Sequence, residues 1–169
     1  MFDGDELIGI RLTSLHETPA ERKAKFELLP DYKEVIDAQQ VATREQKRLH
    51  AIIESVYAVA ANYLPDDCGP VYFDMEMVSI KRKYRGGNLS MRLYQELFKL
   101  AASKGIRYGK VLCTAQASKR VWECARCLQV QYAKFLDDGE PCFQNTPDGS
   151  EFAQLFVADL QQMGYLEDH

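Results

Sequence analysis

The sequence predicts a mixed α/β fold, with a mostly antiparallel sheet, a central pair of parallel strands and flanking helices. An apolar run at residues 71–80 is followed by a helical apolar pattern at 89–103 and by a short buried run at 110–114. A strand–helix–strand succession of this kind forms a right-handed crossover, so its two strands are parallel. Shorter strand patterns before and after this unit predict antiparallel flanks.

Length and composition predict one domain over residues 1–169, because the chain has no repeat or obvious linker and 46% of its residues are apolar. A net charge of −4 argues against a general nucleic-acid binder. No apolar run approaches the ~20 residues that span a bilayer. The acidic N-terminus lacks the pattern of a signal peptide, so we expect no membrane partner.

The chain has five cysteines, at positions 68, 113, 124, 127 and 142. The odd number and the lack of a secretory signal favour free thiols in a reducing cytosol, which predicts a cytoplasmic protein. Cys124 and Cys127 have the spacing of half a zinc site, but a second pair is missing. Two neighbours on one helical turn is the favoured interpretation, and we expect no metal.

The N-terminal region predicts a short strand at residues 6–12, rich in branched apolar side chains. The turn dipeptide Asp3-Gly4 precedes it, although only Met1 and Phe2 come before that turn. Either the turn is a frayed end or the partner strand is missing. Residues 15–44 are polar and predict loops and short helices.

Residues 45–64 predict a helix, because apolar residues recur at helical spacing and Thr43 with Gln46 forms a capping-box pattern. The strand at 71–80 alternates until residues 77–80, where the break indicates a bend or burial on both faces. The helix at 89–103 shares one apolar face, made of Leu89, Leu93, Leu97, Leu100 and Ala101. Residues 109–114 predict the second parallel strand.

The C-terminal third predicts a helix at 118–128 with Ser118 as a possible N-cap. A closing hairpin follows, with strands at 130–135 and 140–143 around the turn 137–139. Residues 151–163 predict a terminal helix.

The loop between the strand at 71–80 and the helix at 89–103 is the strongest candidate for a ligand site. Gly86 and Gly87 let the backbone turn tightly and approach a ligand. The following helix start offers unpaired N–H groups and a positive dipole end, which suit an anion. The nearby cations suit a diphosphate: Lys81, Arg82, Lys83 and Arg85. A solvated basic turn that caps a helix is the alternative.

The segment Tyr84–Ser90 resembles the Arg-x-x-Gly-x-Gly/Ala pyrophosphate loop of the GCN5-related N-acetyltransferases (GNATs). Further segments are similar to the invertebrate arylalkylamine (dopamine-type) N-acetyltransferases: Val78-Ser79-Ile80, Arg92-Leu93, Val111–Ser118, Gly139-Glu140 and Phe143. The resemblance covers most of residues 6–145. It implies a GNAT-like sheet, acetyl-CoA as co-substrate and a small aromatic amine as substrate.

Three departures from the family pattern stand out. Asn88 replaces the main glycine of the loop and Ser90 its final Gly/Ala, while residues 125–127 replace a usual Leu-Gly-Phe. The family also has strands and helices before the strand at 6–12, so the resemblance implies an N-terminally truncated relative. Those segments supply the amine pocket and a proton-relaying glutamate. We therefore expect little amine acetylation by this chain alone, and self-association through the uncovered strand edge at 6–12.

The resemblance implies two groups of site residues. Backbone groups of Val78 and Ile80 would pair with pantetheine, and the loop would hold the pyrophosphate through Arg85, Gly86, Gly87, Asn88, Leu89 and Ser90. The hydroxyls of Thr114 and Ser118 match two serines proposed to orient the proton relay and to donate to the CoA sulfur. A strand-end hydroxyl and a helix N-cap are their ordinary structural alternatives. Cys113, in an apolar strand, predicts packing rather than a nucleophile.

Two functions remain open. In the first, which the resemblance implies, the chain is an acetyl-CoA-dependent N-acetyltransferase that acts on a small arylalkylamine by direct acetyl transfer. The alternative is a catalytically inactive, truncated GNAT-like protein that binds CoA or another protein. Which amine is preferred does not follow from the sequence.

Overall fold

The computed structural model describes residues 1–21, 25–119 and 125–167, and its chain divides into two compact units. The first unit comprises residues 1–18, 65–111 and 157–169, and the second comprises 19–64 and 112–156. One sheet has the strand order β3-β4-β5-β9-β6. Its strands β5 and β9 contribute residues to both units. No helix in the described ranges is long and apolar enough to cross a membrane.

The first unit begins with a small hairpin, β1 (Phe2–Asp3) and β2 (Glu6–Leu7), which pair antiparallel. Gly4 in its turn has φ 55°, a value that glycine adopts without a Cβ penalty. The N-terminal turn therefore has a partner strand, contrary to the expectation that it was orphaned. That expectation failed because strands of only two residues each carry no periodic signal in a sequence.

Strand β3 (Gly9–Glu17) continues from the hairpin and pairs antiparallel with β4 (Val71–Ile80). The predicted strand at 6–12 thus divides into β2 and the first part of a longer β3. The register of the pair shifts between Leu12 and Thr13, opposite Met77 and Met75. This β-bulge lies next to the break in alternation that the sequence shows after residue 76.

Strands β4 and β5 (Tyr108–Cys113) are parallel, which confirms the predicted crossover. Their register joins Phe73 to Gly109 and Asp74 to Lys110. A Cβ on Gly109 would lie 2.1 Å from the ring of Phe73, so this crossing requires glycine. Lys110 forms a buried ion pair with Asp74 beside it.

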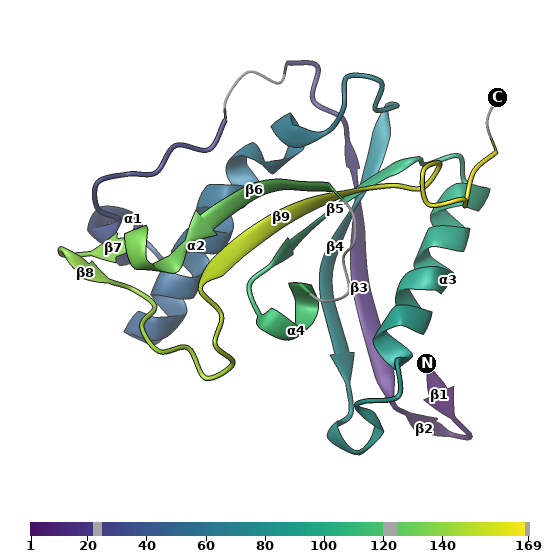
Figure 1. The fold of residues 1–169 in the computed structure, drawn as a ribbon, viewed down its shortest axis with the longest axis horizontal. Helices are drawn as coiled ribbons and strands as arrows, with labels where there is room; N and C mark the ends of the chain where they lie inside the picture. The colour runs from purple at the N-terminus through teal and green to yellow at the C-terminus, as the bar shows by residue number, and fades with distance from the viewer. Residues whose placement is uncertain (22–24, 120–124, 168–169) are drawn as a thin grey trace. The chain divides into compact units, whose positions relative to one another are not determined.

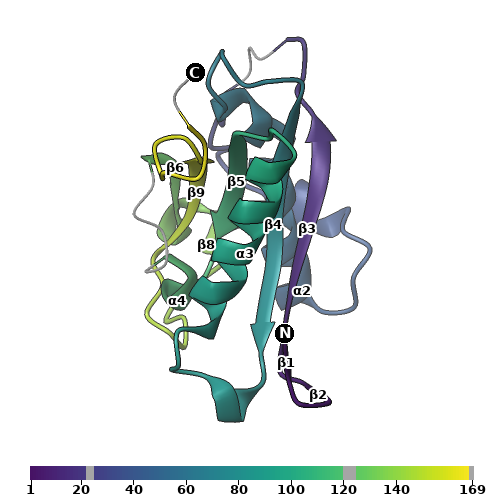
Figure 2. The ribbon, with the colours of Figure 1, turned by 90° about the vertical axis from the view of Figure 1, so that its right-hand side faces the viewer.

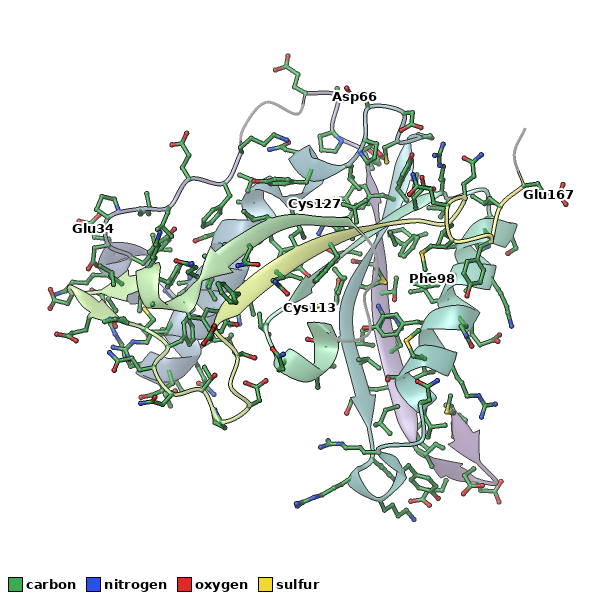
Figure 3. All side chains as sticks on the ribbon, in the orientation of Figure 1. Glu34, Asp66, Phe98, Cys113, Cys127 and Glu167 are labelled. Atoms are coloured by element: carbon green, nitrogen blue, oxygen red, sulfur yellow. The ribbon has the colours of Figure 1, made fainter. Side chains whose placement is uncertain are left out.

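Helix α3 (Leu89–Ser103) forms over the predicted residues and lies along one face of β3 and β4 (Figures 1 and 2). Its buried residues are Tyr94, Phe98 and Ala101, whereas Leu100 is 56% exposed. Phe98 points toward the sheet (Figure 3), with its ring centroid 6.2 Å from that of Phe73. The buried face of α3 is therefore rotated by about one residue from the predicted leucine face, because the larger aromatic rings fill the space above the sheet.

The second unit contains α1 (Lys33–Asp37), α2 (Arg44–Ala60) and the 3₁₀ turn η1 (Ala61–Tyr63). Thr43 and Gln46 form the predicted capping box. The core of this unit joins the two α-helices to the strands that follow along the chain, and includes Tyr32, Ile52, Val56, Phe135 and Leu155.

The rest of the second unit corrects two helix predictions. Helix α4 covers only Gln116–Lys119, and Ala125–Gln131 form strand β6; residues 120–124 of the predicted helix lie outside the described ranges. Leu128 is half-buried and Val130 is buried, whereas Gln129 and Gln131 are exposed, which is the alternation expected of a strand. Strand β9 (Phe152–Asp159) replaces the predicted terminal helix, because five of its residues, Ala153 and 155–158, are buried in mid-sheet.

The closing hairpin is smaller than predicted, and its predicted first strand at 130–135 is wrong, because these residues form the end of β6 and a 3₁₀ turn. The 3₁₀ turn η3 (Tyr132–Lys134) leads to β7 (Leu136–Asp137) and β8 (Glu140–Pro141), which pair around Asp138 and Gly139. Arg44 and Arg48 of α2 both bond the buried carboxylate of Asp137 and hold its pKa below its usual range. The turn position is therefore confirmed and is fixed by ion pairs within the unit.

Candidate functional site

The predicted site residues belong to both units. Those of the first unit are Val78, Ile80 and the six residues from Arg85 to Ser90, and those of the second unit are Thr114 and Ser118. Each group has a defined local geometry.

The loop before α3 has the backbone geometry of a tight turn. The 3₁₀ turn η2 (Arg82–Tyr84) is followed by Gly86 with φ 90° and by Asn88 with φ 57° and ψ 18°. Asn88 thus adopts the left-handed conformation for which glycine is usually required. A Cβ on Gly86 would meet no atom within 4 Å, so only its backbone angle demands glycine.

The start of α3 leaves backbone donors uncommitted. Asn88 is the N-cap, but its side chain makes no capping hydrogen bond. The first helical bond runs from the N–H of Arg92 to the carbonyl of Asn88, at 3.3 Å. The N–H groups of residues 89–91 therefore have no acceptor within the helix, and the helix dipole adds positive potential there. This end of α3 suits an anion.

Glu6 forms ion pairs with two of the four cationic side chains that the sequence analysis assigned to this loop. Its carboxylate accepts from Lys81 Nζ at 3.0 Å and from Lys83 Nζ at 2.7 Å. These bonds, with one from Tyr84, lower the pKa of Glu6 to about 2. Among the described residues Arg82 and Arg85 form no ion pair, so the cations open to a diphosphate are these two rather than four.

Val78 and Ile80 direct their backbone groups away from β3. The N–H of Lys81 donates to the carbonyl of Ile8 at 2.8 Å, while Gly9 stands opposite Ile80. Gly9–Ile80 is therefore a non-hydrogen-bonded pair, and by alternation Arg11–Val78 is another. Backbone groups that point away from the β3–β4 hydrogen bonds in this way can pair with amides of a ligand. Arg85 Nε already donates to the Ile80 carbonyl at 3.0 Å.

In the second unit Thr114 follows β5 and Ser118 lies inside α4. The carbonyl of Thr114 accepts a 2.6 Å hydrogen bond from the hydroxyl of Tyr132. Ser118 Oγ donates to the carbonyl of Ala115 at 2.7 Å. Ser118 therefore does not cap the helix, and its hydroxyl must rotate before it can donate elsewhere.

Asp148 caps α4 instead. Its carboxylate accepts from the N–H of Gln116 at 2.7 Å and from Ser150 Oγ at 2.9 Å. These bonds lower the pKa of Asp148, so it is ionised at neutral pH. Glu6 and Asp148 are the two acidic residues that sequence reasoning missed, because each acts on a segment far from it along the chain.

The cysteines agree with the free-thiol prediction in the described ranges. Cys113 on β5 is fully buried and Cys127 lies on β6 (Figure 3). Burial raises the pKa of the Cys142 thiol to about 11, which keeps it protonated. No cluster of three potential metal ligands occurs among residues 1–21, 25–119 and 125–167. Cys124 lies outside these ranges.

No family model and no curated protein matches the sequence. Solved structures match it over most of its length. Arylalkylamine N-acetyltransferase 2 from Aedes aegypti has a TM-score of 0.71 at 16% identity, over 95% of this chain and 71% of that chain. Drosophila melanogaster polyamine N-acetyltransferase has a TM-score of 0.64 at 15% identity, over 94% of this chain and 72% of that chain.

A third match is the C-terminal condensation domain of Ebony, solved with β-alanyl-dopamine. Its TM-score is 0.61 at 15% identity, over 92% of this chain and 68% of that chain. At such identities the likeness defines the fold: the chain has the GNAT fold of insect amine N-acetyltransferases.

Proposed function

We propose that this chain is an acetyl-CoA-dependent N-acetyltransferase for a small arylalkylamine. The observation that carries the proposal is the strand–loop–helix of residues 78–90. Gly86 and Asn88 have positive φ, the N–H groups at the start of α3 are uncommitted, and Arg82 and Arg85 are exposed in the loop that precedes them. The GNAT fold of the chain supports the same conclusion. We further propose a cytoplasmic protein that acts as a single domain.

The residues of this loop fit a CoA diphosphate. The backbone of residues 85–90 and the arginine side chains would hold it. Val78 and Ile80 would pair with pantetheine through their backbone groups once the Arg85 side chain leaves the Ile80 carbonyl and turns to the diphosphate. Both arginines are exposed, so each is accessible to a ligand. Guanidinium groups and helix N-termini are common partners of phosphate.

The reaction is direct transfer. The neutral amine nitrogen attacks the thioester carbonyl, an N–C bond forms, and the C–S bond breaks. The amine loses one proton and the departing thiolate gains one, so the products are an N-acetylamine and CoA thiol. Thr114 would orient the proton relay, and Ser118 would donate to the sulfur after its hydroxyl leaves the Ala115 carbonyl.

The test is an assay of the full chain with acetyl-CoA and three amines, dopamine, tyramine and serotonin. The expected result is a low yield of N-acetyl product by mass spectrometry, with one free thiol released per product, because the resemblance implies little acetylation by this chain alone. Thr114→Val should lower kcat, whereas Thr13→Val, the same change on strand β3 at a hydroxyl without a hydrogen-bond partner, serves as the matched control. Absence of product with every amine overturns the enzymatic proposal.

The second candidate is a CoA-binding or protein-interaction module without catalysis. The bond from Ser118 Oγ to the Ala115 carbonyl favours it, because that hydroxyl is already used inside the short helix. CoA binding by calorimetry without turnover of any amine supports this candidate, and turnover excludes it.

A further inference from the structure

The N-terminal hairpin contacts the loop that precedes α3. Both belong to the first unit, and Figures 1 and 2 show β1 and β2 at the same end of that unit as the loop. The carboxylate of Glu6 accepts hydrogen bonds from Lys81 Nζ, Lys83 Nζ and the Tyr84 hydroxyl, at 2.7–3.0 Å. Asp3 accepts from the same hydroxyl at 2.8 Å. Two acidic side chains of the hairpin therefore bind three residues of the loop.

Apolar packing does little to fix the hairpin in this position. Each of its strands has only two residues, and an isolated two-stranded hairpin is at best marginally stable in water. Its apolar side chains are not buried, since Phe2 is 65% and Leu7 is 43% exposed. The buried side chain of Ile8 marks the point where the chain enters the sheet. The contacts of Asp3 and Glu6 therefore determine where the hairpin lies.

The hairpin lowers the positive charge of the loop. Residues 81–85 carry four cationic side chains and residues 3–6 carry three acidic ones, so the formal charge falls from +4 to +1 where the two segments meet. Uncompensated cations attract a phosphate ligand over about 10 Å at 0.1 M salt. Glu6 thus neutralises two ammonium groups that a ligand with several phosphates would otherwise meet.

The contact is exposed and therefore reversible. Lys81 and Lys83 are more than half exposed and Glu6 is 36% exposed, and ion pairs of this kind are weak and screened by salt. The Tyr84 phenol has one proton, so it donates to only one of the two carboxylates at a time. The pKa of Glu6 is about 2, so protonation of Glu6 does not release the hairpin near neutral pH. Release therefore requires a competing anion.

We propose that the N-terminal hairpin is an autoinhibitory element, which neutralises the cations of the loop until a polyphosphate ligand displaces Asp3 and Glu6. The inference rests on the proposed CoA site and adds a regulation to it. The phosphates of CoA bind Lys81 and Lys83, the hairpin loses its side-chain contacts, and it moves away about Ile8. Because displacement of the hairpin requires free energy, CoA binds more weakly to this chain than to one whose hairpin is already released.

Calorimetry of CoA binding to the full chain tests the proposal. Glu6→Gln removes the charge that holds both lysines and should tighten CoA binding by about three- to tenfold at low salt. The matched control is Asp5→Asn, which removes the same charge from the turn of the same hairpin. Among the described residues no hydrogen bond or ion pair joins Asp5 to the loop, so its variant should bind CoA within about twofold of the wild type. Urea unfolding checks that both variants are folded.

Hydrogen exchange of the wild-type chain provides a measurement that needs no variant. Saturating CoA should speed the exchange of the backbone amides of residues 2–8, because the hairpin leaves the loop.

Equal CoA affinity of the wild type and Glu6→Gln, equal effects of Glu6→Gln and Asp5→Asn, or exchange of residues 2–8 that CoA slows or leaves unchanged overturns the autoinhibitory assignment and leaves the proposed function standing. Absence of CoA binding to both the wild type and Glu6→Gln overturns both. Tighter CoA binding by Glu6→Gln without acetylation of any amine by either chain supports the hairpin assignment and refutes the proposed function alone.

Discussion

Asn88 shows how a single residue connects sequence, backbone and binding. The sequence places it where the family loop has glycine, and the structure gives it φ 57°, a left-handed conformation. Asn is among the few residues that tolerate this region, because its short side chain can bond locally. The left-handed conformation of position 88 could therefore be predicted from the residue type. The commitment of Lys81 and Lys83 to Glu6 could not, because Glu6 lies some 75 residues away.

Asn88→Gly should leave the free energy of unfolding within about 1 kcal/mol of the wild-type value. The relief of left-handed strain is offset by the greater freedom of glycine in the unfolded chain. CoA binding should be unchanged or tighter, because the side chain no longer crowds the loop. Urea unfolding and calorimetry measure the two effects. Clearly weaker CoA binding would instead identify the Asn88 side chain as a ligand of CoA.

Glu6 predicts a specific pH dependence of stability. Its pKa falls from 4.5 to about 2 on folding, so its ion pairs stabilise the fold above about pH 4.5 and lose this effect as the pH falls toward 2. The difference in unfolding free energy between wild type and Glu6→Gln should therefore be present at pH 6 and absent near pH 2. Urea unfolding across this range measures it, with Glu140→Gln as control. A difference that stays constant with pH contradicts the ion-pair assignment.

At the scale of elements, the crossover was predictable and the C-terminal strands were not. The boundaries of β4 and α3 follow from clear periodicity between turn signals. In β9, Phe152, Leu155, Phe156 and Ala158 satisfy helical spacing as well, because a strand buried on both faces shows no alternation. The position of this segment within the sheet decides between helix and strand, and that position cannot be derived from the local sequence. For β6, the alternation of residues 128–131 is visible in the sequence. The apolar residues before it also fit a helical pattern, which led to the prediction of a helix at 118–128.

Gly109→Ala should destabilise the protein by about 1–3 kcal/mol. The added Cβ would lie 2.1 Å from the ring of Phe73 at the point where β4 and β5 pair, so the ring or the backbone must move. Gly69→Ala is the matched control, because its Cβ would meet nothing within 4 Å and its φ is not positive. Urea unfolding compares the two, and equal stability of both variants would show that the crossing accommodates a methyl group.

At the scale of the whole molecule, β3 ends the strand order of the sheet and carries apolar side chains on its surface. Among the described residues no strand pairs with its outer edge. Leu12 and Leu15 are 46% and 58% exposed, and Ile10 is 38% exposed. Open edges of this kind invite pairing with another chain.

We expect the protein to self-associate in a concentration-dependent way through β3, as sedimentation velocity can measure. Leu12→Lys should shift the equilibrium toward the monomer, because a charged side chain on an edge strand opposes pairing. Leu100→Lys changes an exposed leucine on α3 and should have no such effect. A wild-type protein that stays monomeric at all concentrations, or two variants that behave alike, contradicts this expectation.

The central claim is that residues 85–90 and the start of α3 form a CoA diphosphate site, and CoA binding to charge-reversal variants tests it most directly. Calorimetry should show binding to the wild-type chain and a loss of about tenfold or more in affinity for Arg85→Glu, because a charge-assisted phosphate contact becomes a repulsion. Lys104→Glu reverses an exposed charge at the other end of α3 and should bind CoA within about twofold of the wild type. Equal affinities of the wild type and Arg85→Glu would remove this loop from the site and contradict the account.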